Sequence, residues 1–428
     1  SRYFASKHDV LCRAAPDRLL KLAPSFKQAA YPLVILRQRN YALLWSSTTI
    51  VAMGTQMEAM VLSWFVYSLT GSAFLTGSIA AARMSLNVLA LFSGAIADRL
   101  PRHRLLAGVE FTMASLGILM LLLILLGRLE VWHIFAITVT AGLVRIFQMP
   151  AAQSLVADTL AEDRISNGAA LNTVGMNMAV IGGPIAGGVL LRAFDAPGAY
   201  TAIAALYWLS GIFALSIRVS GSRVIPRRES VLRTVLEGLR YVRGQQVLWA
   251  TLLVAVVINL TGWPFHQVLL TVFAKDELGT DAAGLGLLQT GFGIGALSGS
   301  IAWSLVRNIR QAGKLMILSI IAWHATMLVF ALSSIYFVSL AILIATGMAF
   351  SSTQVLMLTV MLRSTQQEYR GRVVGLRVLA INAFTFGSMG AGGIAGLWGA
   401  PWAAVTIGSL GIGLTVLLVS FTPKLLRA

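Results

Sequence analysis

Four charged side chains lie inside long apolar stretches of the sequence: Glu58, Arg83, Glu110 and Arg145. A lone charge is expensive in a hydrocarbon environment, so a charged residue kept there is a candidate for function. A carboxylate removed from water binds a proton more readily, and a nearby arginine can pair with it or attract an anion. These residue types therefore indicate proton-linked chemistry in apolar surroundings.

We take Glu58 as the candidate proton-coupling group, because it lies near the middle of the first apolar stretch. Arg145 is expected to attract an anionic part of a substrate or to favour proton release from Glu58. Arg83 and Gln148 are the other candidates for a central cavity. A second interpretation stays open, in which Glu58 is permanently paired with Arg83 or Arg145 as a structural link. Glu110 lies near the end of the third stretch and is expected to pair with a loop arginine.

The composition indicates where these residues must lie. The 428 residues are 57% apolar and 11% charged, against roughly a half and a quarter in a soluble domain. The single cysteine, Cys12, excludes an intramolecular disulfide and a cysteine-based metal centre, and the five histidines lack metal-ligand spacing. We therefore expect an integral membrane protein with no cofactor and no metal. No nucleophile–base set is recognisable, so an enzyme is not expected.

A helix that crosses a bilayer needs about 20 mostly apolar residues, and the chain holds enough such stretches for twelve. The predicted fold is an all-α polytopic membrane protein, with twelve transmembrane helices in two pseudo-symmetric six-helix halves around a central cavity. The predicted spans are about 41–69, 73–97, 105–127, 131–157, 165–191, 196–217, 244–274 and 282–306, then two each in 315–362 and 378–423. The last two stretches are expected to divide at Ser333-Ser334 and at Gly399 to Pro401, where serine, glycine and proline disfavour a helix.

The chain carries 33 Lys and Arg against 16 Asp and Glu, a net charge of +17. Almost all basic residues fall in residues 1–40, in residues 218–246 and in alternate loops. Under the positive-inside rule both termini face the cytoplasm, at a bacterial-type inner membrane. We divide the chain into a basic cytoplasmic segment (1–40), a first half (41–217), a basic linker (218–246), a second half (247–422) and a tail (423–428). Nucleic-acid binding is not expected, because the composition leaves too little polar surface for it.

Apolar residues recur at helical spacing between the arginines of the linker. This pattern predicts an amphipathic helix. Two interpretations of it remain, a helix bound to the anionic cytoplasmic leaflet and a solvated linker helix that helps to set the orientation.

The turn after the second span carries a distinctive motif. It reads Gly94-Ala-Ile-Ala-Asp98-Arg99-Leu-Pro-Arg102-His-Arg104, which resembles the G-x-x-x-D-R-x-x-R-R signature of the major facilitator superfamily. The resemblance implies a latch that holds the cytoplasmic side shut through salt bridges. A partner for Asp98 is expected at the start of span eleven, from Arg370, Arg372 or Arg377. The corresponding turn of the second half has Trp303 in place of the aspartate.

Two further segments are similar to exporter motifs of this superfamily. Span five contains Gly183-Pro184-Ile-Ala-Gly187-Gly188, similar to the core G-P-x-x-G-G of the exporter motif. Span four contains Arg145-Ile-Phe-Gln148, similar to the R-x-x-Q-G element of proton-coupled exporters, with Met149-Pro150 replacing the glycine. Other segments, including Arg370-Gly-Arg372-Val-Val-Gly375, resemble the branch with the enterobactin exporter and macrolide-efflux-type drug:proton antiporters.

This resemblance implies a secondary active transporter, a proton-coupled exporter of a small amphipathic molecule such as a siderophore or drug. Its expected partners are that substrate, protons and a bilayer with an anionic cytoplasmic leaflet, and it is expected to be a monomer. Two alternatives remain. One is a transporter of lysophospholipid or another lipid, and the other is a non-transporting scaffold or assembly factor on the same fold.

Overall fold

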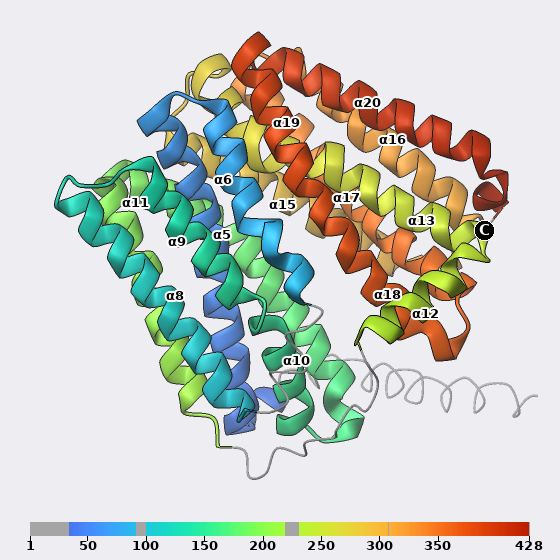
Figure 1. Ribbon diagram of the computed structural model, residues 1–428, viewed down its shortest axis with the longest axis horizontal. Helices are drawn as coiled ribbons and strands as arrows, with labels where there is room; N and C mark the ends of the chain where they lie inside the picture. The colour runs from blue at the N-terminus through green and yellow to red at the C-terminus, as the bar shows by residue number, and fades with distance from the viewer. Residues whose placement is uncertain (1–33, 91–99, 219–230, 307, 428) are drawn as a thin grey trace, which may run out of the picture.

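The computed structural model describes residues 34–90, 100–218, 231–306 and 308–427 (Figure 1). Every regular element in these ranges is helical. The apolar stretches cannot leave backbone groups unpaired in lipid, and a helix satisfies them within its own segment. The predicted all-α membrane fold is confirmed.

The first half contains six helices, which form six membrane spans. Helices and spans do not correspond one to one: α9 and α10 form one span interrupted at residues 146–147, and α11 forms two spans, because Asp195 has a non-helical backbone (φ 53°, ψ −168°). The short turns Ile35–Arg37, Leu86–Leu89 and Glu162–Arg164 are 3₁₀. The helices are α5 (Arg39–Thr70), α6 (Ala73–Ser85), α8 (Arg102–Leu125), α9 (Val131–Arg145), α10 (Gln148–Thr159) and α11 (Ile165–Leu215).

The second half follows a separate helix, α12 (Val231–Arg243). Its first span is irregular: α13 (Gln246–Val257) continues through π-helical turns and α14 (Leu270–Val272) to Glu277. Pro264 lies between two of these turns and has no N–H to donate. Span eleven joins α18 (Arg370–Leu379), a 3₁₀ turn and α19 (Ala383–Trp398). The other spans are α15 (Ala282–Ser304), α16 (Ala312–Ala331), α17 (Tyr336–Ser364) and α20 (Ala400–Phe421), before a 3₁₀ tail (Pro423–Arg427).

These spans agree with the twelve predicted from the sequence. The chain turns between α16 and α17 at Ser333-Ser334 and between α19 and α20 at Gly399, as predicted. Several helices begin before their predicted spans, at Arg102, Ala312 and Arg370 instead of 105, 315 and 378. Arginine and lysine can lie in a first turn because their long side chains carry the charge out to water.

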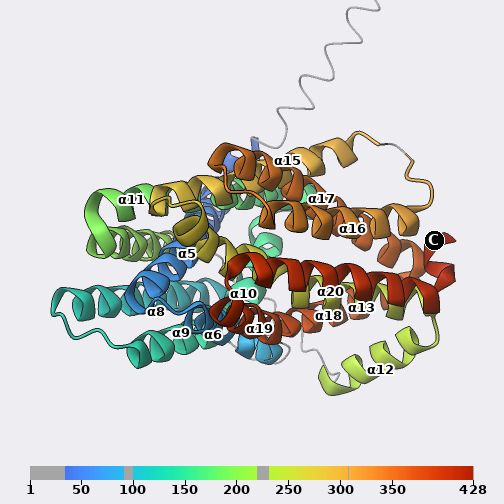
Figure 2. The same cartoon turned by 90° about the horizontal axis from the view of Figure 1, so that it is seen from above.

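Glycines set how closely the two halves approach. A Cβ on Gly77 of α6 would lie 2.2 Å from the carbonyl oxygen of Ser388 on α19, and one on Gly188 of α11 would lie 2.4 Å from that of Ala282 on α15. The α6–α19 and α11–α15 contacts therefore form the seam between the halves (Figures 1 and 2).

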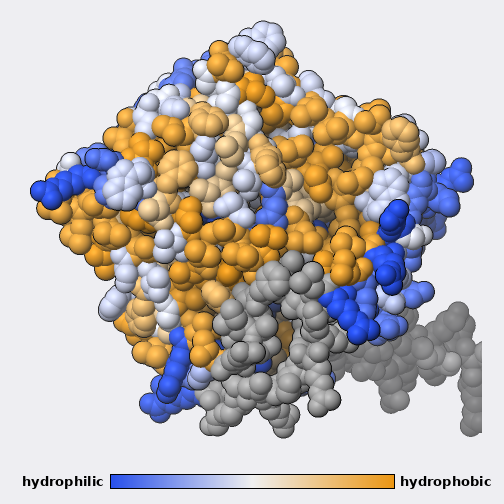
Figure 3. Space-filling view, viewed as in Figure 1, coloured by the Kyte–Doolittle hydropathy of each residue, from blue (hydrophilic) through white to orange (hydrophobic). Residues whose placement is uncertain are grey.

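The bundle has two ends, which we name by residues. The Tyr67 end carries the α5–α6 turn and lies at the top of Figure 1; the Arg102 end carries the start of α8 and lies at the bottom. Apolar residues cover much of the visible surface between the two ends (Figure 3). Side chains such as Phe337 and Leu397, 75% and 78% exposed, suit contact with lipid.

Candidate functional site

Glu58 and Arg145 form an ion pair in the interior of the first half. Arg145 donates from Nη2 to Glu58 Oε2 at 2.7 Å, and their side chains are 15% and 17% exposed for Glu58 and Arg145. The Tyr207 hydroxyl on α11 donates to the same oxygen at 2.7 Å, and Arg145 Nη1 donates to Thr55 Oγ1 at 2.8 Å. Three helices, α5, α9 and α11, therefore meet at one carboxylate.

Arg83 joins this group through the backbone. Its Nη2 donates to the carbonyl oxygen of Thr55 at 3.1 Å. Gly142 makes this arrangement possible, because a Cβ there would lie 3.0 Å from the Arg83 carbonyl oxygen, so α9 packs directly on α6. We call Thr55, Glu58, Arg83, Arg145 and Tyr207 the Glu58 network. The structure thus brings three of the four predicted cavity candidates together, with Arg145 as the partner of Glu58.

The fourth candidate, Gln148, lies elsewhere. Its Nε2 donates to Glu110 Oε1 at 2.8 Å. Glu110 is fully buried, and its Oε2 has no hydrogen-bond partner among the described residues. The expectation that Glu110 pairs with a loop arginine is therefore wrong for the described part of the chain. Its amide partner replaces the arginine because Glu110 lies two turns inside α8, beyond the loop.

A helix interruption separates Arg145 from Gln148. Pro150 has no N–H, and a proline ring clashes with the carbonyl of the residue four before it, here Ile146. The helix accordingly breaks at residues 146–147, between α9 and α10. Arg145 ends one segment and Gln148 begins the next. Glu58 and Glu110 are therefore bound by residues on opposite sides of the same helix break.

The predicted cytoplasmic latch is only partly covered by the described residues. Gly94, Asp98 and Arg99 lie outside them. Arg102 Nη1 contacts both carboxylate oxygens of Asp158 at 2.9 Å, so this ion pair joins α8 to the end of α10 within the first half. Arg104 is exposed.

One of the arginines expected to meet the latch, Arg372, has a partner on the linker helix. Arg372 Nη1 lies 3.3 Å from Glu237 Oε2 on α12, which ties the linker helix to α18. Tyr241 and Tyr369 stack beside this pair with ring centroids 4.1 Å apart.

The exporter-like motif of span five packs on two neighbours. On one side a Cβ at Gly183 would lie 2.7 Å from Gln56, and one at Gly187 would lie 3.0 Å from Met57, both on α5. On the other side Gly188 meets α15, and the Pro184 carbonyl oxygen lies against Gly286. The motif therefore links the helix that carries Glu58 to the second half.

The Tyr67 end holds polar contacts between the halves that the sequence analysis did not identify. Tyr67 donates a hydrogen bond to Asp276, and Lys275 lies 5.6 Å from the centroid of the Tyr67 ring. Ser63 and Thr271 hydroxyls are 2.7 Å apart, and Arg192 pairs with Asp281 at 3.1 Å. Tyr67 and Asp276 are 209 residues apart and Ser63 and Thr271 are 208 apart, about one repeat, which is the signal that could have revealed these two pairs.

The interior of the second half holds aromatic rings. Trp263 and Phe350 pack edge to face with centroids 5.1 Å apart, and His266 stacks on Phe292 at 4.1 Å. Trp323 contacts Phe350 at 5.1 Å. His266 Nδ1 is buried without a hydrogen-bond partner among the described residues. We call Trp263, His266, Phe292, Trp323 and Phe350 the aromatic group.

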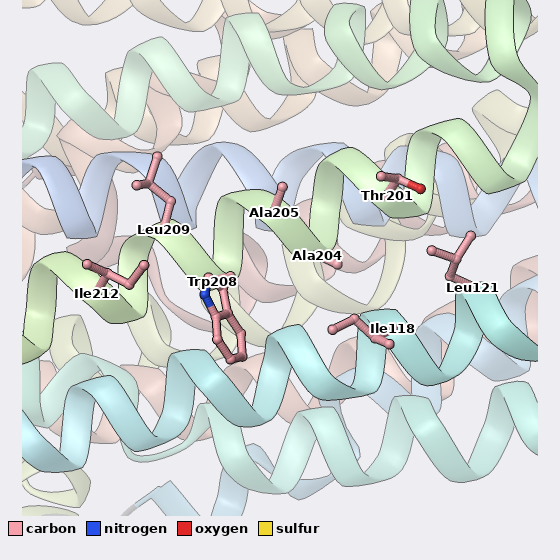
Figure 4. Close-up of a pocket in the computed structure, with 8 residues that line it drawn as sticks. All are labelled: Ile118, Leu121, Thr201, Ala204, Ala205, Trp208, Leu209 and Ile212. Atoms are coloured by element: carbon pink, nitrogen blue, oxygen red, sulfur yellow. The ribbon is translucent and has the colours of Figure 1, made fainter.

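A shallow groove of about 340 Å³ lies between α8 and α11, and no residue of the Glu58 network or the aromatic group lines it (Figure 4). Ile118, Leu121, Trp208 and Ile212 are among the residues that line it. None of its lining residues is charged. It can hold an apolar chain, but it offers no group for proton chemistry.

Comparison with known proteins decides the family. Residues 30–425 match the transmembrane secretion effector family of the major facilitator superfamily. The chain belongs to this family. It is therefore a multi-pass membrane transporter and not an enzyme.

Relatives of this transporter include efflux proteins. The multidrug efflux pump Tap of Mycolicibacterium fortuitum is 25% identical over 349 residues, which cover 79% of this chain and 84% of Tap. Macrolide efflux protein A of Streptococcus pyogenes is 20% identical over a match that covers 64% of this chain and 68% of the efflux protein. The staphyloferrin A transporter of Staphylococcus aureus is 22% identical over a match that covers 53% of this chain and 57% of that transporter.

Solved transporters share the fold. The nucleoside transporter NupG superposes with a TM-score of 0.70 at 14% identity, covering 89% of this chain and 99% of its own. A bacterial homologue of the human lysosomal transporter Spinster, in an inward-facing and unoccupied conformation, superposes with a TM-score of 0.68 at 13% identity. The superposition covers 91% of this chain and 96% of the homologue. The predicted twelve-helix architecture is thus that of known transporters in this superfamily.

Proposed function

We propose that this transporter is a proton-coupled exporter of small amphipathic molecules, with Glu58 as the residue that exchanges protons. It works by alternating access as a monomer in a bacterial inner membrane, with both termini in the cytoplasm. The observation that carries the proposal is the largely buried pair of Glu58 and Arg145, joined by Tyr207. A buried charge pair is stable only while both partners remain charged.

Proton binding to Glu58 removes the negative charge of this ion pair. Arg145 then keeps its charge and loses its charged partner, so its guanidinium must find another acceptor or an anionic part of the substrate. Release of the proton restores the pair. Proton and substrate thereby favour different arrangements of the same helices, which is the condition for coupling.

Helix α5 connects this exchange to the seam between the halves. Glu58 and Tyr67 lie nine residues apart on α5, about 14 Å along a helix. Movement of α5 at Glu58 therefore acts on the Tyr67–Asp276 and Ser63–Thr271 contacts. The positive-inside rule assigns the Tyr67 end to the outside, because Arg102, Arg372 and the basic linker lie at the other end.

The substrate class follows from two kinds of surface. Arg145 and Arg83 can meet an anionic or polar group, while the aromatic group suits an apolar, ring-containing part. The printed names of the relatives, which concern drugs, macrolides and staphyloferrin A, agree with molecules of mixed character.

Transport by the purified full chain in proteoliposomes tests the proposal. A radiolabelled macrolide, ethidium and a lysophospholipid serve as probes, with and without an imposed pH gradient. We expect gradient-driven uptake of the macrolide or ethidium by the wild type, and loss of the gradient dependence in Glu58→Gln. Glu162→Gln, an exposed carboxylate in the 3₁₀ turn before α11, is the matched control.

Each other outcome decides against part of the proposal. Gradient-driven uptake that persists in Glu58→Gln rejects Glu58 as the coupling group. Transport of the lysophospholipid alone supports the lipid-transporter alternative. No transport of any probe by the wild type supports a scaffold.

A further inference from the structure

We propose that Glu110 is a second proton-binding residue of this transporter, which holds a proton in the present conformation and releases it toward the Arg102 end. The inference rests on the proposed proton coupling and extends it to a carboxyl group outside the Glu58 network. The helix break between Arg145 and Gln148 links the two carboxyl groups.

The surroundings of Glu110 fit a neutral carboxylic acid. The side chain is fully buried, its Oε1 accepts one hydrogen bond from the neutral amide of Gln148, and its Oε2 has no partner in the described chain. No described cation lies within ion-pair distance of it. An ionised carboxylate without a counter-charge is costly to bury, whereas a protonated one carries no charge and exposes a single O–H.

The helices packed on α8 carry few titratable or charged groups that could change the protonation state of Glu110. Helix α9 contributes Arg145, whose charge acts on Glu110 through space. Its guanidinium is already engaged by Glu58 at 2.7 Å. On the neighbouring α10 and α11, Asp158 is held by Arg102, Arg192 pairs with Asp281 of the second half, and Tyr200 and Tyr207 are buried.

The break at residues 146–147 makes the two sites respond together. Arg145 at the end of α9 holds Glu58, and Gln148 at the start of α10 holds Glu110. A change in the angle between α9 and α10 therefore alters both hydrogen bonds at once. The interruption caused by Pro150 gives this span a point at which such a change costs little.

Proton release from Glu110 then has a defined route. Glu110 lies eight residues into α8, roughly 12 Å from the Arg102 end. When α10 moves away, one water replaces the Gln148 amide at Oε1 and another reaches Oε2; the Oε2–H bond breaks and its proton passes to the water at Oε2. The carboxylate left behind is stabilised by water and by Arg145, and it binds a proton again when the site closes.

Infrared difference spectroscopy on the full chain in an ester-free detergent tests the protonation state. We expect a band of a protonated carboxyl group at neutral pH that disappears in Glu110→Gln. The band should stay in Glu58→Gln, because Glu58 forms an ion pair with Arg145, and in the exposed control Glu162→Gln. A spectrum of Glu110→Gln identical to that of the wild type would overturn the proposal.

Transport in proteoliposomes tests coupling separately. Glu110→Gln should lose pH-gradient-driven accumulation and keep exchange of labelled for unlabelled substrate. Unchanged accumulation in Glu110→Gln reduces Glu110 to a structural acid and overturns the proposal. If the wild type shows no gradient-driven transport, the proposed function fails, and the infrared band still decides whether Glu110 holds a proton.

A second variant keeps the test valid if Glu110→Gln does not fold. Gln148→Leu leaves Glu110 in place and removes the amide that donates to Oε1. The carboxyl band should remain and change in frequency. An unchanged frequency contradicts the assignment.

Discussion

Gly187 and Gly188 of the first half recur as Gly392 and Gly393 in the second, and the same offset places Phe350 opposite Arg145. The N-terminal caps Ser72 and Asp281 give a slightly larger offset, so Glu58 falls opposite residues 263–267. The ion pair of the first half thus corresponds to the contact of Trp263 and Phe350 in the second. At this level the first half carries an ion pair and the second carries aromatic rings.

This difference suggests a division of labour between the halves. An ion pair changes strength when one partner is protonated, whereas an edge-to-face ring contact does not. We therefore expect substitutions in the Glu58 network to change the dependence of transport on pH, and substitutions in the aromatic group to change substrate affinity. The expected effects are ordered below from the largest to the smallest.

Arg145→Ala should have the largest effect. It leaves the largely buried Glu58 without its cation, and removal of one partner of a fully buried pair costs about 3–5 kcal/mol, which is the upper limit here. Thermal unfolding in detergent should occur at a clearly lower temperature than for the wild type, and transport should be lost. The double variant Glu58→Gln/Arg145→Gln removes both charges and should recover most of the stability. Equal unfolding temperatures for Arg145→Ala and the wild type would contradict a structural demand for the pair.

Tyr207→Phe should have an intermediate effect. Its hydroxyl donates to Glu58 and accepts from Arg145 at 2.9 Å, and hydrogen bonds to charged groups contribute about 1.5–3 kcal/mol. We expect a lower unfolding temperature and an altered pH profile of transport. Tyr336→Phe is the matched control, because its hydroxyl donates to the neutral Gly284 carbonyl in the second half. A pH profile altered equally by both variants would remove the contrast between the halves.

Trp263→Leu tests the aromatic group. Loss of an aromatic pair costs about 0.5–1.5 kcal/mol beyond the lost area. We expect a higher KM for the macrolide or ethidium and an unchanged dependence on the pH gradient. Trp398→Leu, at a ring that is 64% exposed, is the control and should leave KM unchanged. A lost gradient dependence in Trp263→Leu would assign coupling to both halves.

The sequence predicted much of the fold because membrane spans depend on length and apolarity alone. The turn at Ser333-Ser334 and the turn at Gly399 were predicted for the same reason, since local residue chemistry decides them. The pairing of Glu58 with an arginine was expected as one of two interpretations, and Arg145 is its partner.

The facing of helices could not be predicted in the same way. A helix that is apolar all round gives no amphipathic signal for which side meets its neighbour. Gln148 was therefore placed with Arg145, whereas the Pro150 interruption turns it toward Glu110. The Tyr67 contact with Asp276 was missed because it depends on how the two halves meet, which glycine packing along α6 and α11 decides.

His266→Phe should have the smallest effect and gives the sharpest test of the comparison. The ring stacks on Phe292, and its Nδ1 has no partner in the described residues. Replacing an unpartnered buried polar atom by an apolar one costs little or stabilises. We expect unchanged or slightly higher thermal stability and an unchanged pH profile of transport.

His324→Phe is the control for that variant, because both ring nitrogens of His324 are engaged, by Thr261 at 2.8 Å and by the Ile320 carbonyl at 2.9 Å. It should lower the unfolding temperature without changing the pH profile, since neither histidine faces a described ion pair. A shift of the pH profile in His266→Phe alone would place a proton-binding group beside Trp263. The second half would then carry proton chemistry of its own, and the division between a charged half and an aromatic half would fail.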